Sequence, residues 1–214
     1  MSQSNLSEHI RTLKQYIEQK DYDNFNSFLD DNEVSKKTLN SILCFALQNY
    51  HSNYEMVDYI QLLIAKGADP NSMFHSTSSN RGPRIEEKDN VSLLMYACIY
   101  ADIGLVWPMV TEKNINLRDK NGKNALFYVL SYRGDNPDVV GKLIYHGINV
   151  NCVGKIDMGD KTFENHTALS FAASKNMIYS FKTLIENGAD PNFKVYPSGD
   201  TILHIAVRKN NIEM

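Results

Sequence analysis

The sequence predicts an all-α solenoid of stacked helix pairs with hairpin-like loops, and two recurring motifs support this fold. The first motif is Gly-Ala-Asp-Pro-Asn, which stands at residues 67–71 and again at 188–192. A near copy, Gly-Ile-Asn-Val-Asn, occupies 147–151, and a degenerate copy occupies 113–117. Each copy follows an apolar run with helical spacing. Because glycine readily ends a helix and proline cannot continue one, these are helix stops, and their recurrence indicates a repeated unit.

The second motif begins a helix after each stop. Its copies stand at 201–206 (TILHIA), 167–172 (TALSFA), 124–129 (NALFYV) and 92–97 (SLLMYA), with a fainter copy at 41–46 (SILCFA). Two of the spacings between successive copies are about 33 residues, and the other two are longer by roughly ten and nearly twenty residues. The longer spacings predict insertions at 152–165 and at 72–89. The latter is rich in Ser, Asn, Gly, Pro and charge, which is typical of a flexible loop.

Together the two motifs resemble those of the ankyrin-repeat family, whose units start a helix with Thr-Pro-Leu-His-x-Ala and end with Gly-Ala-Asp-x-Asn. The resemblance covers most of the chain after about Lys36. The Pro of the motif is absent from every copy, and its His survives only as His204. The resemblance implies a solenoid of about five to six units. Two short helices cannot bury their apolar face alone, so the units must stack to fold.

The predicted organisation has an N-terminal part and an array. Residues 1–35 show two helical patterns and are expected to form a helical cap or a degenerate repeat. Residues 36–214 are expected to form the ankyrin-repeat array, with the flexible insertion at 72–89 and the second insertion at 152–165. The last repeat stops at Met214, where its second helix should begin. We therefore expect this repeat to be incomplete and the natural chain to continue.

Composition argues against several classes of function. The net charge of −3 gives no reason to expect nucleic acid as a partner, because a nucleic-acid-binding surface is usually strongly basic. No apolar run approaches the roughly 20 residues of a membrane span, and the polar N-terminus lacks a signal-peptide core. The cysteines, Cys44, Cys98 and Cys152, lack metal-type spacing and fit a reducing compartment. We expect a cytoplasmic monomer without cofactor or metal, in the host cytosol if the protein is a pathogen effector.

No catalytic constellation stands out. Cys44 and Cys98 fall within inner helices and are expected to be buried, whereas Cys152 begins a loop and is the better candidate for a reactive thiol. The resemblance implies that His204 makes a local hydrogen bond that fixes its loop. It also implies that Asn151 is a candidate acceptor for asparaginyl hydroxylation. Alternatively, Asn151 fixes its own loop by a hydrogen bond.

The candidate partner-binding residues are those that the ankyrin pattern leaves variable on the concave side. They lie at the loop tips and at the ends of the inner helices: Tyr100, Tyr132, Lys120, Asn121, Lys123, Glu164, His166, Lys175, Arg208 and Lys209. Tyr100 and Tyr132 fall at matching places in adjacent units. Two aromatic anchors beside Lys and Arg suit a protein segment with an apolar and acidic face. Alternatively, the two tyrosines pack on their own neighbours. His166 is expected at an exposed helix start.

These features favour a non-catalytic protein–protein interaction module that binds another protein through its concave ankyrin surface and inserted loops. The alternative is a substrate- or host-targeting region of a larger effector, enzyme or ubiquitin-ligase adaptor whose C-terminal part is missing here. The resemblance implies that layout for pathogen effectors and for poxvirus ankyrin proteins with an F-box-like segment. A stand-alone hydrolase that uses Cys152 is a third interpretation.

Overall fold

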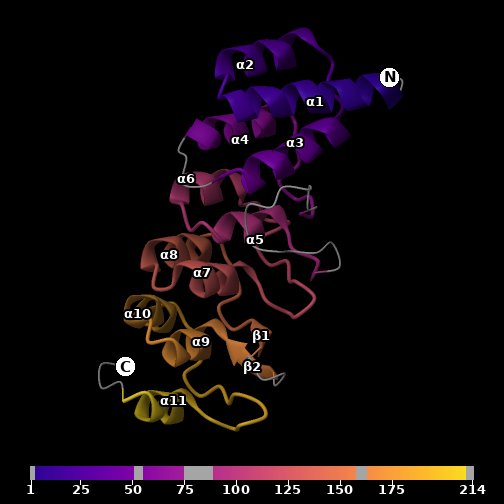
Figure 1. Cartoon of the computed structure of the whole chain (residues 1–214). Coiled ribbons are helices and arrows are strands. Elements are labelled where there is room, and N and C mark those ends of the chain that lie inside the picture. Colours follow the sequence, from indigo (N-terminus) through magenta and orange to yellow (C-terminus); the bar gives the residue numbers. More distant parts are fainter. Residues whose placement is uncertain (1–2, 51–54, 75–88, 158–162, 211–214) are drawn as a thin grey trace.

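The computed structural model describes residues 3–50, 55–74, 89–157 and 163–210, and these residues are mostly helical. The helices follow one another in antiparallel pairs that stack into an elongated array, with the two termini at opposite ends (Figure 1). In chain order the elements are α1 (Gln3–Gln19), α2 (Tyr22–Asp31), α3 (Lys36–Gln48), α4 (Glu55–Ala65), α5 (Leu93–Cys98), α6 (Ile103–Val106), the 3-10 helix η2 (Trp107–Met109), α7 (Ala125–Arg133), α8 (Pro137–Tyr145), β1 (Val153–Asp157), β2 (Phe163–Thr167), α9 (Ala168–Ser174), α10 (Ile178–Glu186) and α11 (Ile202–Arg208).

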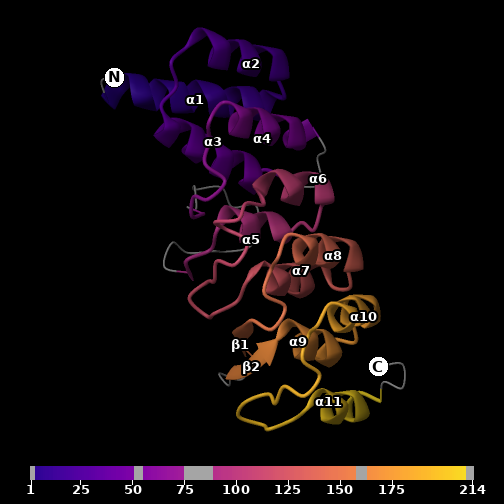
Figure 2. The ribbon, with the colours of Figure 1, turned by 180° about the vertical axis from the view of Figure 1, so that it is seen from behind.

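Two layers of helices run along the stack. We call α3, α5, α7, α9 and α11 the inner helices, and α4, α6, α8 and α10 the outer helices. Each inner helix contacts the next inner helix, each outer helix contacts the next outer helix, and α1 packs on α3 at the N-terminal end. The outer helices lie along one side, whereas the loops before the inner helices and the β-hairpin project to the other (Figures 1 and 2). We call the surface formed by these loops and the exposed side of the inner helices the inner face.

Side-chain hydrogen bonds cap the starts of the inner helices α3, α5, α9 and α11, whereas the N-cap residue of α7 makes none. The hydroxyls of Ser92 and Thr167 each accept a hydrogen bond, at 3.2 Å, from the amide three residues further along the chain. At the start of α11, His204 Nδ1 lies 2.7 Å from the Thr201 hydroxyl and accepts the Thr201 amide at 3.3 Å, which is the local bond expected of this histidine. Such caps satisfy donors that the first turn leaves unpaired, and each is worth about 1 kcal/mol. Helix α3 begins instead after a Ser35 cap, so the faint motif copy at 41–46 lies inside that helix.

The two identical pentapeptides build the same turn at the end of an outer helix. Gly67 and Gly188 have φ angles of +102° and +87°, a left-handed conformation that a side chain would strain. Two residues later, Asp69 Oδ1 and Asp190 Oδ1 each accept the amide two residues on, at 3.0 and 2.8 Å. The Lys36 ammonium, 3.0 Å from Asp69, is the main cause that lowers the pKa of this aspartate. The repeated sequence therefore repeats a specific local structure.

One hydrophobic core runs through the stack. A stripe with one large side chain on each inner helix is buried: Phe45, Tyr96, Tyr128, Phe171 and Ile205. Because each inner helix packs on the next one in the stack, this stripe joins successive units into one core.

The mostly helical structure agrees with the predicted all-α fold class. The second insertion, which was expected to be a loop, contains a β-hairpin. Strands β1 and β2 pair antiparallel, with Gly154 opposite His166. Buried and exposed residues alternate along β1 from Gly154 to Asp157, which is the pattern of a strand. Of the first insertion, residues 75–88 lie outside the described part of the chain.

Candidate partner-binding surface

Asp119 fixes the turn at 119–123 beside inner helix α7. Its Oδ1 atom accepts the amides of Asn121 and Lys123 at 2.8 and 2.9 Å, and its Oδ2 atom accepts the Tyr128 hydroxyl at 2.9 Å. Burial raises the pKa of Tyr128, and the Asp119 carboxylate raises it further. The turn is therefore tied to the helix, and the side chains of Lys120, Asn121 and Lys123 extend from a fixed backbone.

A hollow of about 260 Å³ lies between this turn and the loop that precedes α5. We call it the tyrosine hollow. Its lining residues are Asp89, Val91, Asp119, Lys120, Asn121, Lys123, Phe127, Tyr128, Ser131 and Tyr132. Tyr132 is 49% exposed and stacks on Tyr128, with ring centroids 6.3 Å apart. Lys120 forms an ion pair with Asp89. Four of the predicted partner-binding residues meet here: Tyr132, Lys120, Asn121 and Lys123.

Tyr100 is not the second exposed aromatic anchor that its matching position predicts. Its ring packs edge-on against Tyr50 at 4.9 Å and Tyr96 at 6.0 Å, and its hydroxyl is buried. Burial raises the pKa of Tyr100, against the opposing effects of Tyr96 and Arg133. Tyr100 therefore packs on neighbouring side chains, which is the alternative interpretation given above. Tyr100 does not line the tyrosine hollow.

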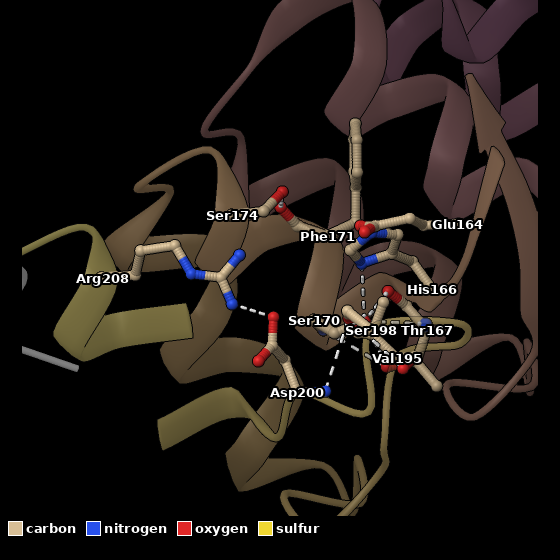
Figure 3. Close-up of polar contacts among 10 residues, drawn as sticks. All are labelled: Glu164, His166, Thr167, Ser170, Phe171, Ser174, Val195, Ser198, Asp200 and Arg208. Carbon is tan, nitrogen blue, oxygen red and sulfur yellow. Dashed lines mark hydrogen bonds and ion pairs between the residues drawn. The ribbon is translucent and has the colours of Figure 1, made fainter. Parts of the chain in front are cut away.

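A second hollow, of about 130 Å³, lies further along the inner face between α9 and α11. We call it the basic hollow. Its lining residues are Glu164, His166, Ser174, Lys175, Val195, Asp200, Ile205, Arg208 and Lys209. Arg208 reaches from α11 to form an ion pair with Asp200 (Figure 3). The Lys175 ammonium lies 5.8 Å from the ring centroid of Phe171. The other five predicted residues meet here: Glu164, His166, Lys175, Arg208 and Lys209.

His166 is buried, so the prediction that it stands at an exposed helix start is wrong. It is 2% exposed because it lies on strand β2, where its ring lies edge-on to Phe171 (Figure 3). Its Nδ1 atom is 3.1 Å from the Ser170 hydroxyl, and its Nε2 atom is 3.2 Å from Glu164 Oε2. Burial lowers the pKa of His166, and the hydrogen bond to Glu164 opposes that effect. The unpredicted hairpin is the reason for the error.

Glu164, His166 and Ser170 are hydrogen-bonded in the order of a hydrolase triad. However, the Ser170 hydroxyl caps the first turn of helix α9. Ser170 is fully buried. Its hydroxyl accepts the amide of Thr167 at 2.9 Å and donates to the carbonyl of the same residue at 3.1 Å. A catalytic nucleophile must reach a bound substrate. The serine is instead enclosed by the first turn of α9.

Comparisons with known proteins agree with the repeated helix pairs. The family model described as "Ankyrin repeats (many copies)" matches residues 169–214. The chain is also similar to the "Putative ankyrin repeat protein L371" of Acanthamoeba polyphaga mimivirus, with 26% identity over 175 residues, which are 81% of this chain and 19% of that protein. The family match and this relative support an ankyrin-repeat protein. A second relative of the chain is the "Nuclear factor NF-kappa-B p105 subunit" of Gallus gallus, 29% identical over 101 residues, which are 47% of the chain and 10% of the relative.

The chain therefore spans less than a fifth of the length of these two relatives. No helix in the described ranges is long and apolar enough to cross a membrane.

Two asparagines link successive ankyrin loops. Asn151 donates from Nδ2 to the carbonyl of Gly188 at 3.1 Å and accepts the amide of Asp190 at 2.8 Å. Asn116 makes the equivalent pair of bonds with the loop at 147–149, at 3.0 and 2.7 Å. The hydrogen bonds expected as the alternative role of Asn151 are thus present, although the residue itself is exposed.

Cys152 is buried, so the prediction of a reactive thiol at the start of a loop is wrong. It is 6% exposed, and its Sγ atom donates to the carbonyl of Gly122 at 3.3 Å. Burial raises the pKa of the Cys152 thiol, with Arg118 opposing, and burial alone raises the pKa of Cys98. A raised pKa leaves less of the nucleophilic thiolate. Cys44 is also buried, and the described residues hold no group of three His, Cys, Asp or Glu that suits a metal ion.

Some residues that line the hollows were not predicted. Asp89 and Val91 line the tyrosine hollow, and Val195 and Asp200 line the basic hollow. The ankyrin register itself could have identified two of them. Asp89 stands in the same place before its helix start as the predicted Asn121 and Glu164, and Asp200 stands directly before its helix start, as His166 does.

Proposed function

We propose that this ankyrin array is a non-catalytic protein-interaction module that binds a partner protein through its inner face. The observation that supports this proposal is the grouping of the predicted variable residues. All of them except Tyr100 line the tyrosine hollow or the basic hollow. Hollows beside exposed aromatic and cationic side chains are where binding energy concentrates in protein interfaces.

The tyrosine hollow supports the proposal most directly. Tyr132 offers a half-exposed ring that Tyr128 holds from one side by stacking. The Tyr128 hydroxyl is fixed in turn by Asp119. A ring held in place loses little conformational entropy when a partner covers it, which is why tyrosine is frequent among residues that dominate binding.

The test is affinity capture from a cell lysate with Tyr132→Ala and a matched control. Tyr145→Ala removes a tyrosine that is 79% exposed on outer helix α8. We expect Tyr132→Ala to weaken binding of a captured protein by roughly tenfold or more, as for a central aromatic contact, and Tyr145→Ala to leave it unchanged. Circular dichroism should show equal helicity for the three proteins. Equal loss of binding with both variants, or no loss with either, would show that the partner does not bind at the tyrosine hollow.

A second candidate function is targeting by a region of a larger effector, enzyme or ubiquitin-ligase adaptor. The greater length of the two relatives supports it, since the chain spans 19% and 10% of them. Sequencing the transcript beyond the codon of Met214 tests the idea. A stop codon directly after that position would remove it.

We propose further that residues 1–35 act as an N-terminal cap and that 36–214 form an array of about five to six units, with insertions at 72–89 and 152–165. The packing of α1 on the first inner helix supports the cap.

We also propose that the protein is a cytoplasmic monomer and that its partner is not a nucleic acid. The net charge of −3 supports the second point. Exposed Asn151 remains our candidate for asparaginyl hydroxylation, although a hydroxylase would first have to break its two loop-linking bonds.

A further inference from the structure

The two hollows occupy equivalent places in the ankyrin register. Counted from the helix-start motifs, Tyr132, Lys175 and Lys209 hold one position in three successive units. At the loop tips, Asn121 of the tyrosine hollow and Glu164 of the basic hollow hold another. The tyrosine hollow lies between the loop before α5 and helix α7, and the basic hollow lies between α9 and α11. One type of site therefore occurs twice on the inner face, two units apart.

The spacing of the helices gives the distance between the hollows. Helix α7 packs on α9, and α9 packs on α11. Packed helices lie about 8–10 Å apart, so two steps correspond to about 16–20 Å. An extended chain rises about 3.3 Å per residue, and it covers this distance in about five or six residues. A single extended segment of a partner can therefore reach both hollows.

The linings of the two hollows differ in chemistry. The tyrosine hollow has a mainly polar lining, in which Lys120 is already paired with Asp89. Its apolar part is made by the stacked rings of Tyr132 and Tyr128 together with Phe127 and Val91. This part of the hollow favours an apolar side chain, because contact with the rings removes its surface from water.

The basic hollow favours an acidic side chain. Its cations are Lys175, Arg208 and Lys209, its carboxylates are Glu164 and Asp200, and burial lowers the pKa of its histidine. Arg208 already neutralises Asp200, and Glu164 is hydrogen-bonded to the histidine. Neither Lys175 nor Lys209 has an ion-pair partner among the described residues, and both are exposed. The two ammonium groups are thus available to a carboxylate from outside.

The β-hairpin between the hollows does not offer a free sheet edge to which a partner could add a strand. On the β1 side, the Lys155 amide donates to the carbonyl of Asn121 at 2.8 Å. On the β2 side, the Asn165 amide donates to the carbonyl of Tyr196 at 2.8 Å. Both edges are bonded to the neighbouring loops, which disfavours recognition by addition of a strand.

We propose that the inner face binds one extended acidic segment of a partner protein, with an apolar side chain in the tyrosine hollow and a carboxylate, about five or six residues away, between Lys175 and Lys209. This inference rests on the proposed function, and it adds the chemistry and the spacing of the ligand. Phage display on the full chain tests it, with a random peptide library of about 12 residues, roughly twice the required span. The enriched peptides should carry an aromatic or aliphatic residue and an Asp or Glu at that spacing.

The contacts are then assigned by fluorescence anisotropy with one labelled enriched peptide. Lys175→Glu combined with Lys209→Glu should weaken its binding by about tenfold, and more salt should weaken the wild-type complex. Replacing the peptide's acid by its amide should weaken binding to the wild type but strengthen binding to the double variant, because the amide removes the repulsion between the acid and the two introduced glutamates. Lys182→Glu, an exposed lysine of outer helix α10, is the matched control and should leave affinity unchanged.

The outcomes separate this inference from the proposed function. Peptides that bind the inner face without the paired residues, or whose acid does not couple to the two lysines, overturn the inference and leave the proposed function standing. Enriched peptides whose affinity is unaffected by both Tyr132→Ala and the lysine variant overturn both. A library that yields no enriched peptide also counts against the inference, because an extended segment of this kind lies within its reach.

Discussion

At the scale of single residues, burial decides which predicted side chains can meet a partner. Tyr132 and Tyr100 hold the same position in adjacent units, yet only Tyr132 is half-exposed. The difference arises from Tyr50, which follows helix α3, hydrogen-bonds to Asp102 and packs against the ring of Tyr100. A pattern with one repeat period cannot show such a contact, since Tyr50 lies outside the motif. The sequence therefore predicted the exposure of Tyr132 but not the packing of Tyr100.

The burial of His166 makes a prediction about pH. Its pKa in the fold lies below the ordinary value of 6.5, so the unfolded chain takes up a proton at a higher pH than the folded chain does. Stability from this residue is therefore present at neutral pH and falls as the pH drops through about 6.5. Urea unfolding at about pH 7.5 and about pH 5.5 should show a larger loss for the wild type than for His166→Gln, which cannot titrate. Equal losses would mean that His166 takes up its proton as readily in the fold as in the unfolded chain.

At the scale of elements, the helix starts and stops were predictable because each depends on a few adjacent residues. Gly188 with Asp190, and Thr201 with His204, form their turn and cap from local hydrogen bonds. The β-hairpin was not predicted, because an inserted segment breaks the repeat and was assigned as a loop. Its position depends on contacts with distant residues, among them the turn at 119–123 that Lys155 meets.

Gly154 allows the hairpin to approach that turn. A Cβ atom at Gly154 would lie 2.8 Å from Lys123 Cγ, 3.1 Å from Phe127 Cζ and 3.2 Å from Lys123 Cα. We expect Gly154→Ala to lower the free energy of unfolding by about 1–3 kcal/mol, as overpacking does. The measurement is urea unfolding monitored by circular dichroism.

Gly141→Ala is the matched control for this substitution. Its Cβ would have its nearest neighbour, Thr183 Cγ2, at an ordinary 3.8 Å, and the residue lies inside helix α8, where alanine is favoured over glycine by up to about 1 kcal/mol. The control should be neutral or more stable than the wild type. A Gly154→Ala variant as stable as the Gly141→Ala control would show that the hairpin does not pack closely on the turn.

At the scale of the whole molecule, the array is a scaffold that repeats one position along a single face. The buried stripe of the inner helices joins the units, and the position four residues further along, that of Tyr132, Lys175 and Lys209, lies at the exposed helix ends. Both sets follow the period of the sequence, because stacking places equivalent residues in a line. The shapes of the two hollows could not be predicted from the sequence period. They depend on loop residues such as Asp89 and Val195, which tertiary packing places next to the inner helices.

Binding of a partner protein to the inner face can be observed by amide chemical-shift mapping of the ¹⁵N-labelled chain with a peptide enriched on it. We expect the largest shifts on the turn at 119–123, around Tyr132, and around Lys175 and Lys209, with little change on the outer helices. Shifts concentrated on outer helices α8 and α10 instead, around the exposed Tyr145 and Tyr179, would contradict it.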